Sequence, residues 1–90
     1  MSKNDDIKKL INDCIFYGMT NFRGGIIPNN NISDNDKMIF LFKQYKKMLH
    51  YYNDLIKVTN KKTKKYNTYL SKIDKIGMYL NLLDNFIIRV

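Results

Sequence analysis

Hydrophobic residues recur at steps of three and four along most of the chain, and this spacing predicts helices. From Ser33 onward the spacing is a heptad repeat with three apolar positions in seven, wide enough for a globular helix bundle. The first half of the repeat contains Met38, Leu41, Phe42, Tyr45, Met48, Leu49, Tyr52, Leu55 and Ile56. The second half contains Tyr66, Tyr69, Ile73, Ile76, Leu80, Leu83, Ile87 and Val90. The sequence therefore predicts two long helices, over about 34–59 and 64–88.

A shorter amphipathic helix is predicted over about residues 5–22, because its apolar residues fall on one face. These residues are Ile7, Leu10, Ile11, Cys14, Ile15 and Met19. The following segment, 21–32, contains two glycines, the only proline and three successive asparagines, so we expect a loop there. Ser33, with Asp36 three positions later, resembles a capping box that starts the next helix.

The polar segment 60–64 between the two long helices allows two architectures. The chain can fold back there as a helical hairpin, or it can continue as one coiled-coil helix over 34–90. The unbroken register and the absence of Gly and Pro from the connection favour continuity, whereas so long a helix is uncommon in a small domain. We expect a single all-α domain over 1–90, built as three helices with a long hairpin. Two such hairpins can also pair as a four-helix bundle, which makes a homodimer a further expectation.

Composition limits the class of protein. Ninety residues suffice for one modest core, and a hydrophobic content of 44% is enough to build it. The longest apolar run, 38–42, is far shorter than a spanning helix, and no apolar stretch follows the N-terminal lysines as in a signal peptide. The single cysteine, Cys14, cannot form an intrachain disulfide. We therefore expect a cytoplasmic protein, in a reducing compartment, with no membrane contact.

The positive charge is concentrated in one part of the chain. Sixteen Lys and Arg against eight Asp give a net charge of +8, and the segment 57–75 alone holds seven lysines and one aspartate. These lysines are Lys57, Lys61, Lys62, Lys64, Lys65, Lys72 and Lys75. A lysine that neutralises a phosphate releases condensed counterions, so such a cluster favours polyanions without sequence preference. The segment thus predicts binding to nucleic acid or a nucleoprotein complex, with an acidic protein surface or a merely solvated connection as alternatives.

Residues with catalytic chemistry are few. His50 is the only histidine and falls at an outward heptad position, and Cys14 falls on an apolar helix face. Neither has an acidic partner placed by spacing, and the chain contains no glutamate, no cysteine cluster and no glycine-rich phosphate loop. We expect no enzyme activity, no metal, no cofactor and no small-molecule substrate.

A second hypothesis is a protein-interaction or oligomerisation module that makes no contact with nucleic acid. Its surface would be an aromatic and methionine face made of Phe40, Phe42, Met48, Tyr51 and Tyr52. Phe40 and Tyr51 lie off the main apolar stripe and leave apolar surface to cover. A small basic chain of this kind also suits an accessory or inhibitor protein of a phage, virus or plasmid that acts on a nucleoprotein.

Overall fold

The computed structural model describes residues 3–89, and in this range it contains three helices and no strand. They are α1 (Lys3–Asn21), α2 (Asp34–Lys57) and α3 (Lys64–Phe86). The all-α prediction is confirmed, and each helix end lies within two residues of its predicted position. Val90, the last position of the predicted repeat, lies outside the described residues. Within that range, no helix is both long and apolar enough to cross a membrane.

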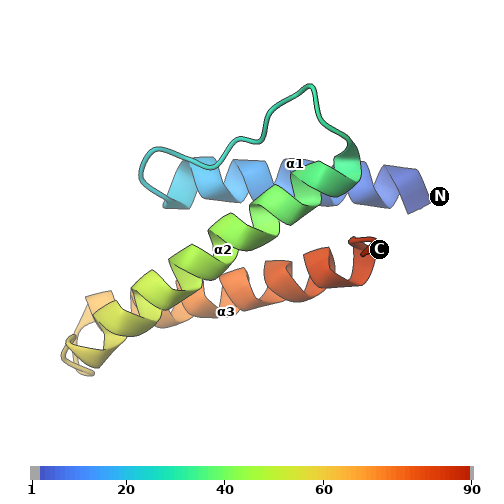
Figure 1. Cartoon of the computed structure of the whole chain (residues 1–90). Helices are drawn as coiled ribbons and strands as arrows, with labels where there is room; N and C mark the ends of the chain where they lie inside the picture. The colour runs from blue at the N-terminus through green and yellow to red at the C-terminus, as the bar shows by residue number, and fades with distance from the viewer. Residues whose placement is uncertain (1–2, 90) are drawn as a thin grey trace.

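Helices α2 and α3 form an antiparallel hairpin and share most of the contacts between helices. The chain therefore folds back at the polar connection, and the alternative of one continuous helix is wrong. Helix α1 lies across the open end of the hairpin, so that the closed end extends beyond it (Figure 1). The molecule is accordingly elongated, with extents of 44 × 24 × 24 Å.

The turn of the hairpin is built by side-chain hydrogen bonds instead of glycine or proline. The Thr59 hydroxyl donates at 2.6 Å to the Leu55 carbonyl, which also accepts the Val58 N–H at 3.2 Å at the end of α2. The Asn60 side chain then accepts from the Lys62 N–H at 2.9 Å, and Thr63 caps α3 by accepting from the Tyr66 N–H at 3.3 Å. Because Asn and Thr make local turns of this kind, the absence of Gly and Pro did not imply a continuous helix.

The predicted start of α2 is confirmed at the atomic level. Ser33 is the N-cap residue, and its hydroxyl accepts from the Asp36 N–H at 3.1 Å. Asp34 and Asp36 lie in the first turn, where carboxylates interact favourably with the positive end of the helix dipole.

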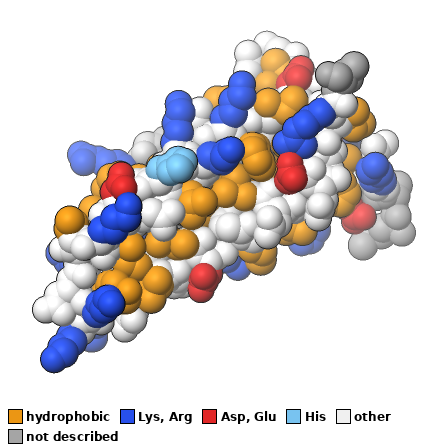
Figure 2. Space-filling model, turned by 60° about the horizontal axis from the view of Figure 1, so that its bottom comes forward, with side chains coloured by type: hydrophobic (Ala, Val, Ile, Leu, Met, Phe, Trp, Pro, Cys, Tyr) orange, Lys and Arg blue, Asp and Glu red, His pale blue; other side chains and the backbone are white. Residues whose placement is uncertain are grey.

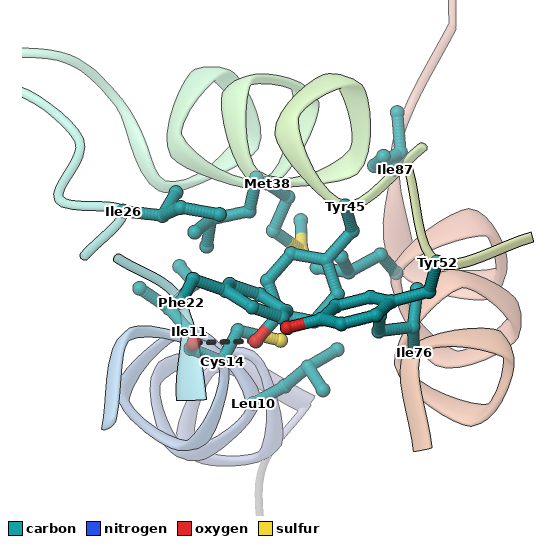
Figure 3. Packing of buried hydrophobic residues seen from close by; sticks show 12 residues of the cluster. Leu10, Ile11, Cys14, Phe22, Ile26, Met38, Tyr45, Tyr52, Ile76 and Ile87 are labelled. Atoms are coloured by element: carbon teal, nitrogen blue, oxygen red, sulfur yellow. Dashed lines mark hydrogen bonds between the residues drawn. The ribbon is translucent and has the colours of Figure 1, made fainter. Parts of the chain in front are cut away.

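The core lies where α1 covers the hairpin, and Figure 3 shows its side chains meeting between the three helices. Its members are Leu10, Ile11, Cys14, Phe22, Ile26, Met38, Leu41, Tyr45, Tyr52, Ile76, Leu83 and Ile87. Most of the hairpin members are heptad positions from the half of α2 and α3 under α1. Toward the closed end, Leu55, Tyr66 and Tyr69 are only half-buried, because no third helix covers them there.

The segment after α1 contributes more to the core than its composition predicts. Phe22 and Ile26 are buried, and the ring of Phe22 packs edge-on against Tyr17 and Tyr45 at centroid distances of 5.6 and 5.4 Å. Met19, which we assigned to the apolar face of the first helix, is instead 59% exposed. The apolar face of α1 thus ends at Gly18, and the loop residues continue the core.

Candidate nucleic-acid interface

The closed end of the hairpin carries five of the seven predicted lysines. Lys57 ends α2, Lys61 and Lys62 lie in the turn, and Lys64 and Lys65 begin α3; all five are exposed. Blue side chains cluster at this end of the molecule in Figure 2. We call these five residues the tip lysines. Most lysines of the predicted segment 57–75 therefore lie together at the protruding closed end of the hairpin.

Two tip lysines occupy positions that oppose helix stability. Lys64 and Lys65 are the first two residues of α3, and that first turn contains no acidic residue. A helix N-terminus carries about half a positive charge, so each lysine there costs about 0.3–1 kcal/mol when exposed. The same N-terminus, with its free N–H groups, attracts anions. The positive end of the α3 dipole and the charges of Lys64 and Lys65 therefore lie at the same place.

Acidic neighbours do little to neutralise the tip. Lys57 approaches Asp54 at 3.9 Å, and both side chains are well exposed, so this pair contributes little. Lys57 also lies in the last turn of α2, where a cation suits the helix dipole. Within residues 3–89, the ammonium groups of Lys61, Lys62, Lys64 and Lys65 form no ion pair. No carboxylate of the described residues therefore neutralises these four side chains.

The other two predicted lysines lie further along α3 and have different surroundings. The half-buried Lys72 donates to the side-chain oxygen of Asn21 at 3.0 Å and lies over the Tyr52 ring at 5.8 Å. Because Asn21 ends α1, Lys72 supplies a cation at a helix C-terminus that has none of its own. Lys75 is exposed and lies over the Tyr79 ring at 5.8 Å. The predicted segment thus divides into the tip lysines and a part along α3, in which Lys72 binds α1.

Further basic residues lie on α2, outside the segment 57–75. Lys43, Lys46 and Lys47 are exposed on α2, and the stretch from 37 to 53 holds four lysines and no acid. In Figure 2 the histidine side chain lies among blue side chains on this face. These lysines are visible in the sequence, but the aspartates at the two ends of α2 largely cancel their charge when the net charge of the whole helix is counted.

The predicted aromatic and methionine face does not form one exposed surface. Tyr52 is a core residue whose hydroxyl lies 3.4 Å from the Asn21 carbonyl, and Phe40 and Met48 are half-buried against the core. The Lys46 ammonium and the Arg89 guanidinium both lie over the ring of Phe42, at 5.4 and 5.7 Å from its centroid. Only Tyr51 is largely exposed, at 54%. The remaining large exposed side chains lie elsewhere, with Phe16 and Met19 on the outer side of α1.

The reactive side chains have the environments that their sequence positions predict. His50 is exposed, and Cys14 is buried among the core residues. Burial raises the pKa of the Cys14 thiol to about 12, so the thiol is protonated at neutral pH. Within the described part of the chain, no three His, Cys, Asp or Glu side chains converge as metal ligands would.

Comparisons of the chain with protein-family models, with curated proteins and with solved structures found no match.

Proposed function

We propose that this protein is a non-catalytic binding module that contacts the phosphate backbone of nucleic acid, free or in a nucleoprotein complex, through its tip lysines. The observation that carries the proposal is the position of Lys64 and Lys65 at the N-terminus of α3, beside Lys61 and Lys62 in the turn. Residues that destabilise their local structure, as these two lysines do at a helix N-terminus, are typical of functional sites. Such a module acts where nucleic acid is present, in the cytoplasm, and an accessory or inhibitor role on a nucleoprotein is the form of activity that we favour.

The contact we propose reads charge and not sequence. Lysine ammonium groups are point charges on flexible stems, suited to phosphates in many geometries. Tyr66, beside the tip lysines, is half-buried, so stacking on bases has a minor part. We therefore expect similar affinity for different sequences and a steep dependence on salt.

The test is a fluorescence-anisotropy titration with labelled oligonucleotides at two salt concentrations. Replacing Lys61, Lys62, Lys64 and Lys65 by Ala should weaken binding at least about tenfold and reduce the salt slope by about three to four. The matched comparison uses two doubles of equal net charge. Lys64→Ala with Lys65→Ala should weaken binding more than Lys3→Ala with Lys8→Ala on α1, where both lysines are exposed. Equal losses in the two doubles, or none in the quadruple variant, would contradict the proposal.

Self-association is the second candidate function, and one observation favours it. Phe16 and Met19 are neighbours one turn apart on α1 and are 68% and 59% exposed. Large apolar side chains grouped in this way are typical of contact surfaces. Sedimentation equilibrium of the wild-type chain and of Phe16→Ser with Met19→Ser tests this candidate. A monomer at all concentrations in both would eliminate it and leave the nucleic-acid proposal untouched.

A further inference from the structure

A groove of about 530 Å³ lies between the end of α1 and the first half of α3. It is lined by Tyr17, Asn21, Asn67, Thr68, Ser71, Lys72 and Lys75. These side chains supply two ammonium groups, amides and hydroxyls, and none of the lining residues is acidic. Hydrogen-bond donors without a carboxylate are the lining that an anion requires.

The donors from α3 share one face of the helix because of their spacing. Asn67, Ser71 and Lys75 follow one another at intervals of four residues, and Thr68 and Lys72 repeat this interval one position later. The row begins two residues after Lys65, the last tip lysine. Ten residues of helix separate Lys65 from Lys75, which is about 15 Å. In that length one strand of nucleic acid carries about four phosphates at B-form spacing.

Lys72 gives the groove one cation whose position is fixed. Its ammonium donates to Asn21 across the junction of α1 and α3, and the Tyr52 ring lies 5.8 Å away. A lysine has three N–H donors, so the bond to Asn21 leaves others for a ligand. Binding a ligand then orders little that is not already ordered, which favours affinity.

We infer that this groove is a phosphate-binding subsite, which takes a phosphodiester of the same nucleic-acid strand that the tip lysines contact. The inference deepens the proposed function and rests on it. Lys72 and Lys75 provide the charge, and Asn67, Thr68 and Ser71 provide neutral donors that fix the position of the phosphate. The path of the strand thus runs from the turn along α3 toward the end of α1.

The test is an NMR titration of the full-length ¹⁵N-labelled chain with two probes, a short single-stranded oligonucleotide without terminal phosphates and inorganic phosphate. The oligonucleotide should shift the amides of Asn67, Thr68 and Ser71 saturably, together with those of the tip. Thr68→Val with Ser71→Ala removes two donors without changing net charge. This variant should bind the oligonucleotide about three- to tenfold more weakly with an unchanged salt slope.

The control variant is Asn81→Ala with Asn85→Ala, which removes two exposed polar groups from the other half of α3 and should bind as the wild type does. Circular dichroism establishes that each variant folds. A second groove variant, Lys75→Gln, should reduce both the affinity for the oligonucleotide and the salt slope.

Shifts at the tip without shifts in the groove would overturn the subsite and leave the proposed function standing. Groove shifts with inorganic phosphate but not with the oligonucleotide would overturn its assignment to the nucleic-acid backbone. No shift at either place with the oligonucleotide would overturn both proposals.

Discussion

The side chain of Asn35, at the start of α2, binds both backbone polar groups of Ile88 across 53 residues of sequence. Its amide nitrogen donates to the Ile88 carbonyl at 3.0 Å, and the Ile88 N–H donates to its oxygen at 2.7 Å. This pair holds the segment after α3 against the open end of the hairpin. Ile87 is buried there. The Arg89 guanidinium lies over the Phe42 ring and forms an ion pair with the Asp84 carboxylate at 2.7 Å.

Asn35→Ala should detach this C-terminal segment. The loss of two partly solvated hydrogen bonds should lower the free energy of unfolding by about 0.5–1.5 kcal/mol. Urea denaturation measures the loss, and hydrogen exchange at the Ile88 amide should accelerate more than at amides in the middle of α3. Asn85→Ala, an exposed change nearby, is the control; an equal effect of the two changes would argue against the role of Asn35.

The buried pair Tyr45 and Cys14 predicts a loss of stability at alkaline pH. The Tyr45 hydroxyl donates to the Cys14 carbonyl at 2.5 Å, drawn as the dashed line in Figure 3, and both side chains are fully buried. Burial raises the pKa of Tyr45 above its ordinary value of 10.0, and raises the pKa of Cys14 from 9.0 to about 12. The unfolded chain therefore releases these protons at lower pH than the folded chain does.

Stability should accordingly be complete below about pH 9 and fall as the pH rises from there toward 12. Urea denaturation at about pH 8 and at about pH 10.5 measures the fall. In Cys14→Ala the unfolded state no longer gains a thiolate, so the fall with pH should be smaller, although the variant is less stable at both values. An equal dependence on pH in the two proteins would contradict the assignment to Cys14.

Reversing the charge of Lys64 should change stability and binding in opposite directions. In Lys64→Asp a carboxylate replaces an ammonium in the first turn of α3, which should raise the free energy of unfolding by about 0.5–1 kcal/mol. Affinity for oligonucleotides should fall at the same time. Lys57→Asp is the informative control, because Lys57 lies in the last turn of α2, and there both quantities should decrease. Thermal denaturation and anisotropy titration of the same samples provide the comparison.

Gly77 is a position where helix stability can be gained without disturbing a contact. It lies inside α3, and a Cβ atom added there meets nothing within 4 Å apart from its chain neighbours and the local helix backbone. Gly77→Ala should raise stability by about 0.5–1 kcal/mol, because alanine loses less backbone entropy in a helix. Calorimetry should show a higher Tm. Gly24→Ala should have the opposite effect, since Gly24 has a φ of 82°, which L residues avoid.

Local pattern accounts for most of the helical structure. The heptad spacing and the Ser33 cap determined α2 and α3 to within two residues, because burying a three-position stripe and satisfying the first N–H groups are local requirements. The same spacing correctly separated the exposed His50 from the buried Cys14. The concentration of lysines between 57 and 75 was equally visible, since charge depends on composition alone.

Tertiary structure decided what the pattern left open. The chain folds back at 60–64 because α2 packs against α3, and the local bonds of Thr59, Asn60 and Thr63 to backbone groups allow the turn. Heptad periodicity records neither. The burial of Phe22 and Ile26 and the attachment of Lys72 to Asn21 both depended on where α1 lies on the hairpin. Sequence determined which residues are basic or apolar. Only the packing of α1 decided that Lys72 is bound, because contacts between distant segments follow from the assembled core and not from spacing along the chain.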